Sequence, residues 1–541
     1  MSTNAFRTPE MIATAEARQD EVPFAEARQS ALRPLPGADA LQPAPAGAGI
    51  TYRHDWGLRR GQWMLQLDWA EVDPRSQVFV AVGEGAAGGP DAGKLVGAAR
   101  CTVHSVAPRA GGVDIWVNIE WDSAISLYAD YLVMNPAGVT GRKVQVTVQR
   151  HDTVPLSDAD ADRILGDMGA TLQSADSASD IATRVQFVRN GPVQVLPPTV
   201  PRTIQTEADL VALLDAGSGI KLVQAIRWCG GPGGSIIGCA PLGSPSVNVA
   251  AVRFTPDQEG ILWVHEYGHN AGLGHRTDDR RAIMYPSIAS DHNVVNAAES
   301  ERFLAGPAAV SGAVPPSSCS PGVAVPPPQD VRAFVSQHWI QGVPYQAASH
   351  YTEEDAKQLL AWLVDEPEQH EEFLPEIVTT LCFIGSEVAV APLIEFMHTV
   401  RASQARFNAK NAVLIHLGDL VNKSGSQAAL AFLVKVATDM ETARTLAVPR
   451  AAIAAAEAAV AGVAAPTTEA LAAELAVSAT FGLALAGRPD AEQTILQLQG
   501  GASAFSAVNA AAAEAAKLSQ TVRAMGQEAY YRMRCEGGHR P

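Results

Sequence analysis

The sequence predicts a multidomain protein: an all-β sandwich at the N-terminus, a central α/β (α+β) domain with a mixed sheet, and an all-α helical repeat at the C-terminus. Three observations support this prediction. Residues 49–140 alternate apolar and polar positions between turn residues, residues 141–307 mix strand and helix patterns, and residues 330–520 are helical in pattern throughout. A chain of 541 residues is also too long for one ordinary core and fits three or four domains.

The composition is that of a globular protein with an acidic surface. Hydrophobic residues make up 47% of the chain and charged residues 18%. The formal net charge is -17 and no basic patch stands out, so we expect no nucleic-acid partner. The N-terminus lacks the apolar stretch of a signal peptide, and the longest apolar run near the C-terminus is too short to span a bilayer. We therefore expect no membrane partner, and either a cytoplasmic location or export without a signal peptide.

The first two segments differ in their hydrophobic pattern. Residues 1–48 are rich in Ala, Pro, Glu and Arg without an apolar period, which predicts a disordered tail with a transient helix near 10–32. Residues 49–140 contain five runs of alternating residues separated by Gly, Pro and Asp, which predict antiparallel strands. Their aromatic residues are expected in the core, with a ligand-binding platform as the alternative; they are Trp63, Trp69, Trp116 and Trp121.

The central segment, residues 141–307, begins with a strand and then a helix. In SDADADRILGDMGATLQ, Ser157 is expected as the N-cap, with Asp158 and Asp160 in the first turn. The repeated aspartates lack the glycine and distal glutamate of a calcium loop, so calcium is not predicted. Further along, Cys229 and Cys239 flank a glycine-rich stretch and either form a local disulfide or remain free thiols.

The C-terminal part follows a Pro/Gly/Ser/Ala-rich linker at residues 308–329. Within residues 330–520, three segments place a leucine four residues before a glycine, then a polar turn and a second apolar helix. The glycines are Gly385, Gly418 and Gly487. Such recurrence predicts stacked helical hairpins that resemble HEAT repeats, whose surface either docks protein partners or substrates or is a stabilising appendage. Residues 521–541 are expected to form a C-terminal tail.

The stretch HEYGHNAGLGH, residues 265–275, carries the chemistry. Its helix is expected to begin with Thr255 as N-cap, Pro256 at the first helical position and Gln258 completing a capping box. His265 and His269 are four residues apart and therefore lie on one helix face, where two imidazoles can bind one metal ion.

The remaining residues of the motif complete an open metal site. Glu266 lies about 100° round the helix from His265, where it can reach a metal-bound water without being a ligand. Gly272 can take positive φ, end the helix and return His275 as a third ligand, leaving the fourth position to water. A closed structural site is the alternative; it would need a fourth protein ligand, and His292, the nearest candidate, is expected to be a loop residue.

Together with AIMYP at residues 282–286, this stretch resembles the metzincin zinc peptidases, and most closely their matrixin branch. The resemblance covers about residues 141–307. It implies that His265, His269 and His275 bind one catalytic Zn²⁺, that Glu266 is the general base and that Met284 forms the turn beneath the site. Tyr285 is not assigned to the metal, because the position of the tyrosine ligand in some relatives is Pro286 here.

The resemblance implies a zinc endopeptidase that hydrolyses peptide bonds through a zinc-bound water activated by Glu266. The expected partner is a protein or peptide substrate, bound in extended form along SIIGCAPLG, residues 235–243, as an edge strand. The alternatives are a protease-fold scaffold of weak or no activity that binds a protein partner, and a hydrolase of non-peptide amides.

Overall fold

The computed structural model describes residues 25–30, 50–69, 72, 74, 76–86, 93–109, 111–134, 142–174, 183–308, 330–365 and 368–535. The chain divides into two compact units, residues 1–142 and residues 143–541. The N-terminal region is built from sheets and the C-terminal region from helices, so the prediction of a multidomain chain with these two ends is confirmed.

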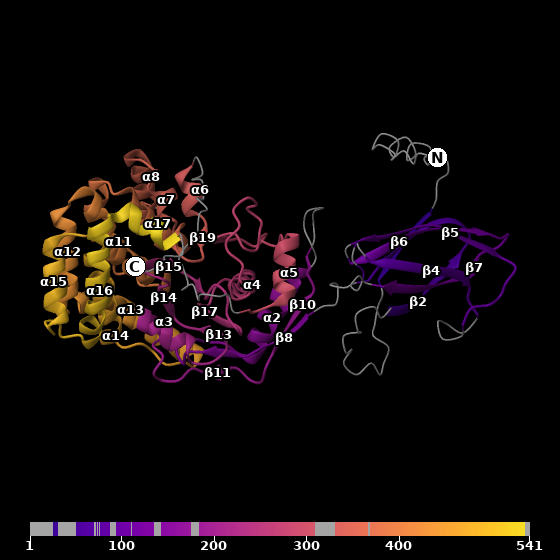
Figure 1. Cartoon of the computed structure of the whole chain (residues 1–541), viewed down its shortest axis with the longest axis horizontal. Coiled ribbons are helices and arrows are strands. Elements are labelled where there is room, and N and C mark those ends of the chain that lie inside the picture. The colour runs from indigo at the N-terminus through magenta and orange to yellow at the C-terminus, as the bar shows by residue number, and fades with distance from the viewer. Residues whose placement is uncertain are drawn as a thin grey trace. The chain divides into compact units, whose positions relative to one another are not determined.

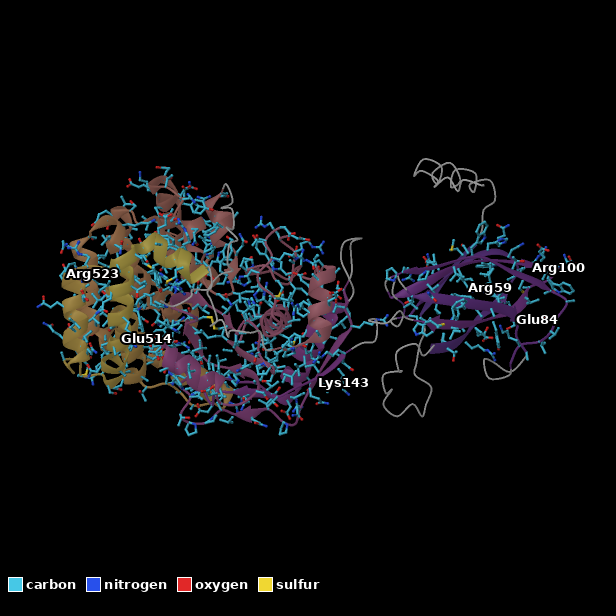
Figure 2. The ribbon with its side chains drawn as sticks, in the orientation of Figure 1. Arg59, Glu84, Arg100, Lys143, Glu514 and Arg523 are labelled. Atoms are coloured by element: carbon cyan, nitrogen blue, oxygen red, sulfur yellow. A yellow bond between two sulfur atoms is a disulfide. The ribbon has the colours of Figure 1, made fainter. Side chains whose placement is uncertain are left out.

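The described part of the first unit consists of strands in two sheets. They are β1 (Ala25–Ser30), β2 (Ile50–Arg59), β3 (Gly61–Asp68), β4 (Gln77–Glu84), β5 (Arg100–Arg109), β6 (Gly112–Glu120) and β7 (Ile125–Met134). One sheet has the order β1-β3-β6-β5 and the other β2-β7-β4. β1 lies within the predicted tail and pairs parallel to β3, so this part of the tail is a strand rather than a transient helix. Charged side chains such as Arg100 lie on the surface of this unit (Figure 2).

The inner faces of the two sheets share one hydrophobic core. Its largest buried side chain is Trp56, whose Nε1 donates a hydrogen bond to the hydroxyl oxygen of Tyr131 at 3.1 Å. Trp63 and Trp69 pack partly buried against this core, whereas Trp121 is 43% exposed. The core prediction was therefore wrong for Trp121, which lies just beyond the end of β6, where strand alternation no longer fixes its direction.

The second unit begins with short strands and helices. From Arg142 to residue 308 these are β8 (Arg142–Val146), β9 (Val148–Arg150), α2 (Asp158–Gln173), β10 (Val185–Arg189), β11 (Gln194–Val195), β12 (Thr203–Ile204), α3 (Glu207–Leu214), β13 (Gly219–Leu222), β14 (Ala225–Trp228), β15 (Pro232–Ile236), β16 (Gly238–Cys239), β17 (Asn248–Ala251), α4 (Glu259–Asn270), β18 (Ser287–Ile288) and α5 (Ala297–Ala305). A five-stranded sheet has the order β11-β9-β13-β17-β16, and a smaller one the order β12-β14-β15. In the larger sheet only β16 runs antiparallel to its neighbour.

Local signals at two helix starts had different outcomes. The Ser157 side chain accepts a hydrogen bond from the Asp160 backbone and Asp160 reciprocates, so the predicted cap of α2 is confirmed. The predicted start of α4 at Thr255 is wrong, because the helix begins at Glu259 with no side-chain cap. The buried carboxylate of Glu259 accepts hydrogen bonds from Arg163 and Arg253, which holds the preceding chain in a turn.

Lys221 on β13 is a fully buried lysine whose charge opposes folding. Its Nζ donates to Asn248 Oδ1 at 2.5 Å, and burial lowers its pKa from 10.5 to about 8. Below pH 8 the folded chain must charge this group in a dry site, whereas the unfolded chain charges it in water; the penalty fades as the pH rises from 8 to 10.5. We expect the free energy of unfolding to rise by about 1–3 kcal/mol over that range from this residue alone.

Denaturant unfolding at a series of pH values measures this contribution. The variant Lys221→Met is expected to lack that part of the rise. If wild type and variant show the same slope between pH 8 and 10.5, Lys221 is not the group responsible.

Helices make up most of the rest of the second unit (Figure 1). The elements are α6 (Val331–Val335), β19 (His338–Trp339), α7 (Tyr345–Ala348), α8 (Glu353–Val364), η3 (Glu371–Phe373), α9 (Leu374–Ile384), η4 (Glu387–Ala389), α10 (Val390–Met397), α11 (Gln404–Ser424), α12 (Gln427–Thr438), α13 (Met440–Ala461), α14 (Thr468–Leu485), α15 (Pro489–Gln499), α16 (Ser506–Met525) and α17 (Gln527–Cys535). The predicted linker lies, apart from residue 308, outside the described residues. The predicted C-terminal tail is helical as far as Cys535, because Tyr531 of α17 is buried and its hydroxyl donates to the Asp419 carboxylate.

The predicted repeat glycines do not have equivalent roles. Gly385 and Gly487 have positive φ at the ends of α9 and α14, as a turn requires. Gly418 instead lies inside α11, and the turn after that helix is made by Gly425. Gly418 packs against the backbone of Gly482 in α14, so it is a helix-crossing glycine, and its placement in the repeat was wrong.

Among the described residues, one helix, α14, is long and apolar enough to cross a membrane by length and composition alone. Of its apolar window, 78% is buried inside the protein. It contacts α11, α12, α13 and α16, which makes it the central helix of this region.

The helical region packs directly onto the smaller sheet. Glu474 of α14 forms an ion pair with Arg202, and its Oε1 also accepts a hydrogen bond from Thr203 at 2.8 Å. His416 of α11 accepts a hydrogen bond from the Gly234 backbone at 3.1 Å. The smaller sheet is therefore held in place partly by the C-terminal helices.

Candidate metal centre

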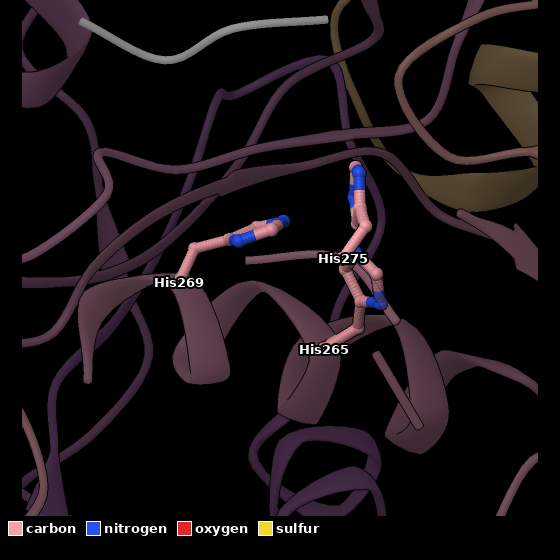
Figure 3. Close-up of side chains that lie close together, drawn as sticks. All are labelled: His265, His269 and His275. Carbon is pink, nitrogen blue, oxygen red and sulfur yellow. The ribbon is translucent and has the colours of Figure 1, made fainter. Parts of the chain in front are cut away.

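Three imidazoles meet at one end of α4. His265 and His269 project from the same face of this helix, and His275 approaches from the chain after it (Figure 3). One nitrogen from each ring lies within 4.8 Å of a nitrogen in each of the other two, and the Nε2 atoms of His265 and His275 are 3.2 Å apart. The structure therefore brings together the three histidines that the motif predicted, and this group can hold a metal ion.

The outer nitrogens of the two helix histidines have fixed roles. Nδ1 of His265 donates to the Ile283 carbonyl and Nδ1 of His269 to the Leu273 carbonyl, both at 2.8 Å. Because a carbonyl oxygen only accepts, each Nδ1 carries the proton and each Nε2 is unprotonated; the Nε2 of His265 faces the Nε2 of His275. His269 Nε2 is buried and has no hydrogen-bond partner among the described residues. Backbone orientation of this kind is typical of metal-binding histidines.

Burial keeps these rings neutral. It lowers the pKa of His269 to about 4 and that of His265 well below its ordinary value, with His269 adding repulsion at His265. Burial and the neighbouring rings lower the pKa of His275 likewise. Neutral imidazole is the form that binds a metal ion, so near pH 7 no proton has to leave before an ion binds.

The turn after α4 is formed as predicted. Gly272 has φ of 83°, and the backbone N–H of Leu273 donates to the Gly268 carbonyl at 2.9 Å, which closes the helix. Positive φ is strained for a residue with a Cβ, so glycine suits this position. The chain then carries His275 back over the helix.

Met284 supports the site from below without joining the cluster. It is fully buried, and a Cβ added at Gly268 of α4 would collide with its Sδ. Its carbonyl accepts the N–H of Arg276, directly after the third histidine, at 2.8 Å. This turn thus packs against α4 through Met284, orients the His265 ring through the Ile283 carbonyl, and holds the segment that carries His275.

Glu266 is fully buried, and neither carboxylate oxygen has a hydrogen-bond partner among the described residues. The side chain faces β16, since a Cβ added at Gly238 would collide with Oε1. Burial raises its pKa well above the ordinary value. A buried carboxylate without a partner is costly, and such groups concentrate at functional sites.

The predicted edge strand is only partly free. β16 ends its sheet, as expected, yet the backbone N–H groups of Ile237 and Gly238 both donate to the carbonyl of Ile340, at 2.8 and 3.2 Å. The sequence analysis missed Ile340, which lies about a hundred residues further along the chain in a segment that was expected to be helical. No local pattern links it to the motif.

His292 was expected to be a loop residue. It lies in a turn outside the cluster but is only 5% exposed. The centroid of its ring is 5.7 Å from that of the Tyr285 ring. It is therefore a core residue of the loop and not a fourth member of the histidine group.

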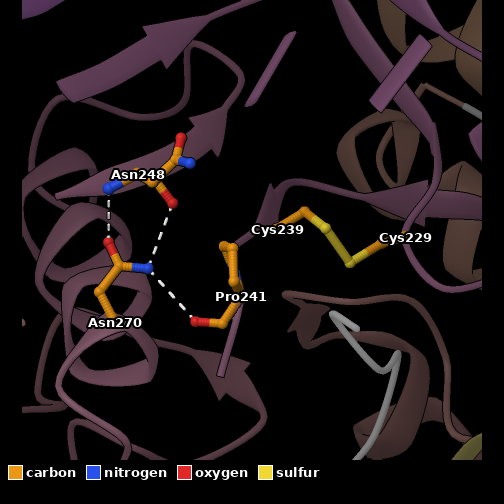
Figure 4. Close-up of a disulfide and its surroundings, with 5 residues drawn as sticks. All are labelled: Cys229, Cys239, Pro241, Asn248 and Asn270. Carbon is orange, nitrogen blue, oxygen red and sulfur yellow. Dashed lines mark hydrogen bonds between the residues drawn. A yellow bond between two sulfur atoms is a disulfide. The ribbon is translucent and has the colours of Figure 1, made fainter. Parts of the chain in front are cut away.

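Cys229 and Cys239 form a disulfide, which settles the alternative that the sequence left open (Figure 4). It joins the ends of β14 and β16 across the glycine-rich loop. Asn270 of α4 ties the chain after β16 to the start of β17, because its side chain donates to the carbonyls of Pro241 and Asn248 (Figure 4). Arg534 of α17 donates to the carbonyl of Pro232, inside the disulfide loop, at 3.1 Å.

No protein-family model matches this chain, and no curated protein is significantly similar to it. The interpretation of the site therefore depends on the geometry above.

Proposed function

We propose that this chain is a zinc endopeptidase of the metzincin type. The observation that carries the proposal is the group of three histidines, with unprotonated Nε2 atoms on His265 and His269, beside Glu266, whose carboxylate has no hydrogen-bond partner among the described residues. Three nitrogen ligands with an open position are typical of catalytic zinc sites, whereas structural sites are closed by four protein ligands. His265, His269 and His275 would hold the ion, and the bound zinc would polarise the peptide carbonyl and lower the pKa of a coordinated water.

Glu266 would move the proton. Its carboxylate would accept a proton from the attacking water as the new C–O bond forms, and deliver it to the amide nitrogen as the C–N bond breaks. Burial makes this carboxylate a stronger base than a solvated one, which favours the first transfer. Gly238, which leaves no side chain over Oε1, would give the carboxylate the room it needs.

The proposed function fits a finer description of the fold. Residues 141–307 would form a matrixin-like catalytic domain with a mixed sheet, residues 49–140 a β-sandwich, and the helices a HEAT-like repeat that docks substrates or partner proteins. The disulfide supports export to an oxidising compartment, since such bonds are rare in the cytosol.

Metal removal tests the proposal. We expect one zinc ion per chain, and we expect chelation to lower the free energy of unfolding by about 3 kcal/mol when free zinc was about 100 times Kd. Adding zinc should restore that stability. His269→Ala should bind no zinc, whereas His292→Ala, a buried histidine outside the cluster, should bind one ion.

Cleavage of labelled casein by the zinc-loaded full chain, assayed alongside, completes the test. Loss of zinc binding in both histidine variants, or in neither, would contradict the assigned ligands. Zinc binding without cleavage of any protein, together with tight binding to one partner, would favour the scaffold alternative.

A further inference from the structure

A short segment from the helical region lies between two parts of the chain that border the candidate site, one around β18 and one around β16. This bridging segment consists of residues 338–341, with β19 at its start (Figure 1). On one side it pairs antiparallel with β18, and Ile340 N donates to the Pro286 carbonyl at 3.0 Å. On the other side the Ile340 carbonyl accepts from Ile237 and Gly238, and Gln341 is bridged to Ile236 in antiparallel fashion.

Both of these parts of the chain contact the candidate site or its support. Gly238 is the residue that packs on the Glu266 carboxylate, and Pro286 is two residues beyond Met284, which supports α4. The backbone of Ile340 therefore binds the N–H groups of the strand next to Glu266 and the Pro286 carbonyl next to the Met284 turn. An extended peptide that added itself to β16 beside Glu266 would need the same N–H groups.

The side chains of the bridging segment alternate between two cores, as strand residues do. Trp339 is buried with the helical cluster and contacts Phe334 at 5.1 Å between ring centroids. Ile340 is 1% exposed and belongs to the same hydrophobic cluster as Met284, Ile288 and Val295. The segment is thus anchored in the helices through Trp339 and in the hydrophobic cluster of Met284 through Ile340.

We propose that the bridging segment occupies the position of a substrate strand on β16 and thereby keeps the peptidase closed. This inference depends on the proposed function of the same site. Ile340 takes the place of a substrate residue, so the substrates are extended peptides with an aliphatic side chain of similar size at that position. Glu266, with both oxygens buried, becomes accessible to water and peptide only when residues 338–341 leave β16.

The variant Ile340→Asp in the zinc-loaded full chain tests this closure, because a carboxylate is costly inside this hydrophobic cluster and favours the displaced segment. Zinc transfer to a chromophoric chelator is expected to become about tenfold faster. This factor follows if the fraction of molecules whose bridging segment has left β16 rises from below about a tenth to near one. Hydrolysis of labelled casein is expected to rise by a similar factor. Ile340→Ala, which is milder, should show a smaller increase in both and serves if the aspartate variant does not fold.

Ile164→Ala is the matched control. Ile164 is a fully buried residue of α2 in the same cluster, yet it does not contact the bridging segment through any backbone pairing. Its variant should lose stability, measured by thermal unfolding, without faster zinc transfer or cleavage.

The outcomes separate this inference from the proposed function. Folded Ile340 variants that release zinc no faster than wild type would overturn the closure, and if wild type cleaves casein the peptidase assignment stands. Faster zinc transfer without casein cleavage by any variant would support the closure and count against the peptidase.

Discussion

Replacing Glu266 by glutamine is expected to slow peptide hydrolysis by about 10²- to 10⁴-fold while one zinc ion stays bound. Glutamine has nearly the same shape but cannot accept a proton from water. Glu266 lies outside the group of ligand atoms, so its loss should leave zinc stoichiometry unchanged. Initial rates on labelled casein and metal analysis of the same samples measure both effects.

The Glu266→Gln variant is also expected to change the pH dependence of stability of the zinc-free protein. Burial raises the pKa of Glu266, so the wild type without metal loses stability as the pH rises above the unfolded value near 4.5. The glutamine variant lacks this loss and should be more stable than wild type at neutral pH. The control Glu514→Gln removes a carboxylate of raised pKa, about 7, far along the chain in α16, and should leave the cleavage rate unchanged. Full activity of Glu266→Gln would rule out the proposed base.

Gly418→Ala is expected to destabilise the second unit by about 2–4 kcal/mol, although alanine favours helix over glycine by about 1 kcal/mol. A Cβ at Gly418 of α11 would overlap the carbonyl of Gly482 in α14, and no flexible side chain is present to yield. The two helices would have to separate, which loosens the packing along their whole contact. Denaturant unfolding measures the change.

Gly166→Ala is the matched control in a helix. Gly166 lies on the exposed face of α2, and nothing comes within 4 Å of a Cβ built there. Its variant should gain about 0.5–1 kcal/mol from helix propensity alone. If Gly418→Ala is stabilised by a similar amount, the backbones of α11 and α14 do not touch at this crossing.

The sequence predicted the site better than the surrounding fold because its signals are local. Four-residue spacing puts His265 and His269 on one face of any helix, and a glycine three residues after His269 can end that helix wherever it lies. The positions of Glu266 and Met284 follow from the same short stretch. By contrast, Gly385 and Gly418 have the same local pattern, and only the neighbouring helix α14 distinguishes a turn from a crossing.

Interactions between distant parts of the chain account for the other differences. The run IKLVQAIRW, residues 220–228, has the pattern of a single strand but divides between β13 and β14, which join different sheets. The carboxylate of Glu259 is held by Arg163, nearly a hundred residues earlier, and this moves the start of α4. Ile340 reaches β16 from the helical region, and neither its periodicity nor its neighbours predict that pairing.

The hydrogen bond from Arg534 to Pro232 joins residues 302 positions apart and touches the disulfide loop that leads into β16. During synthesis on the ribosome, the strand beside Glu266 therefore lacks one of its supports until α17 has left the exit tunnel. A nascent chain would complete the histidine cluster long before this hydrogen bond to the loop leading into β16 can form. The proposed proteolytic activity would then mature only after almost the whole described polypeptide has been made.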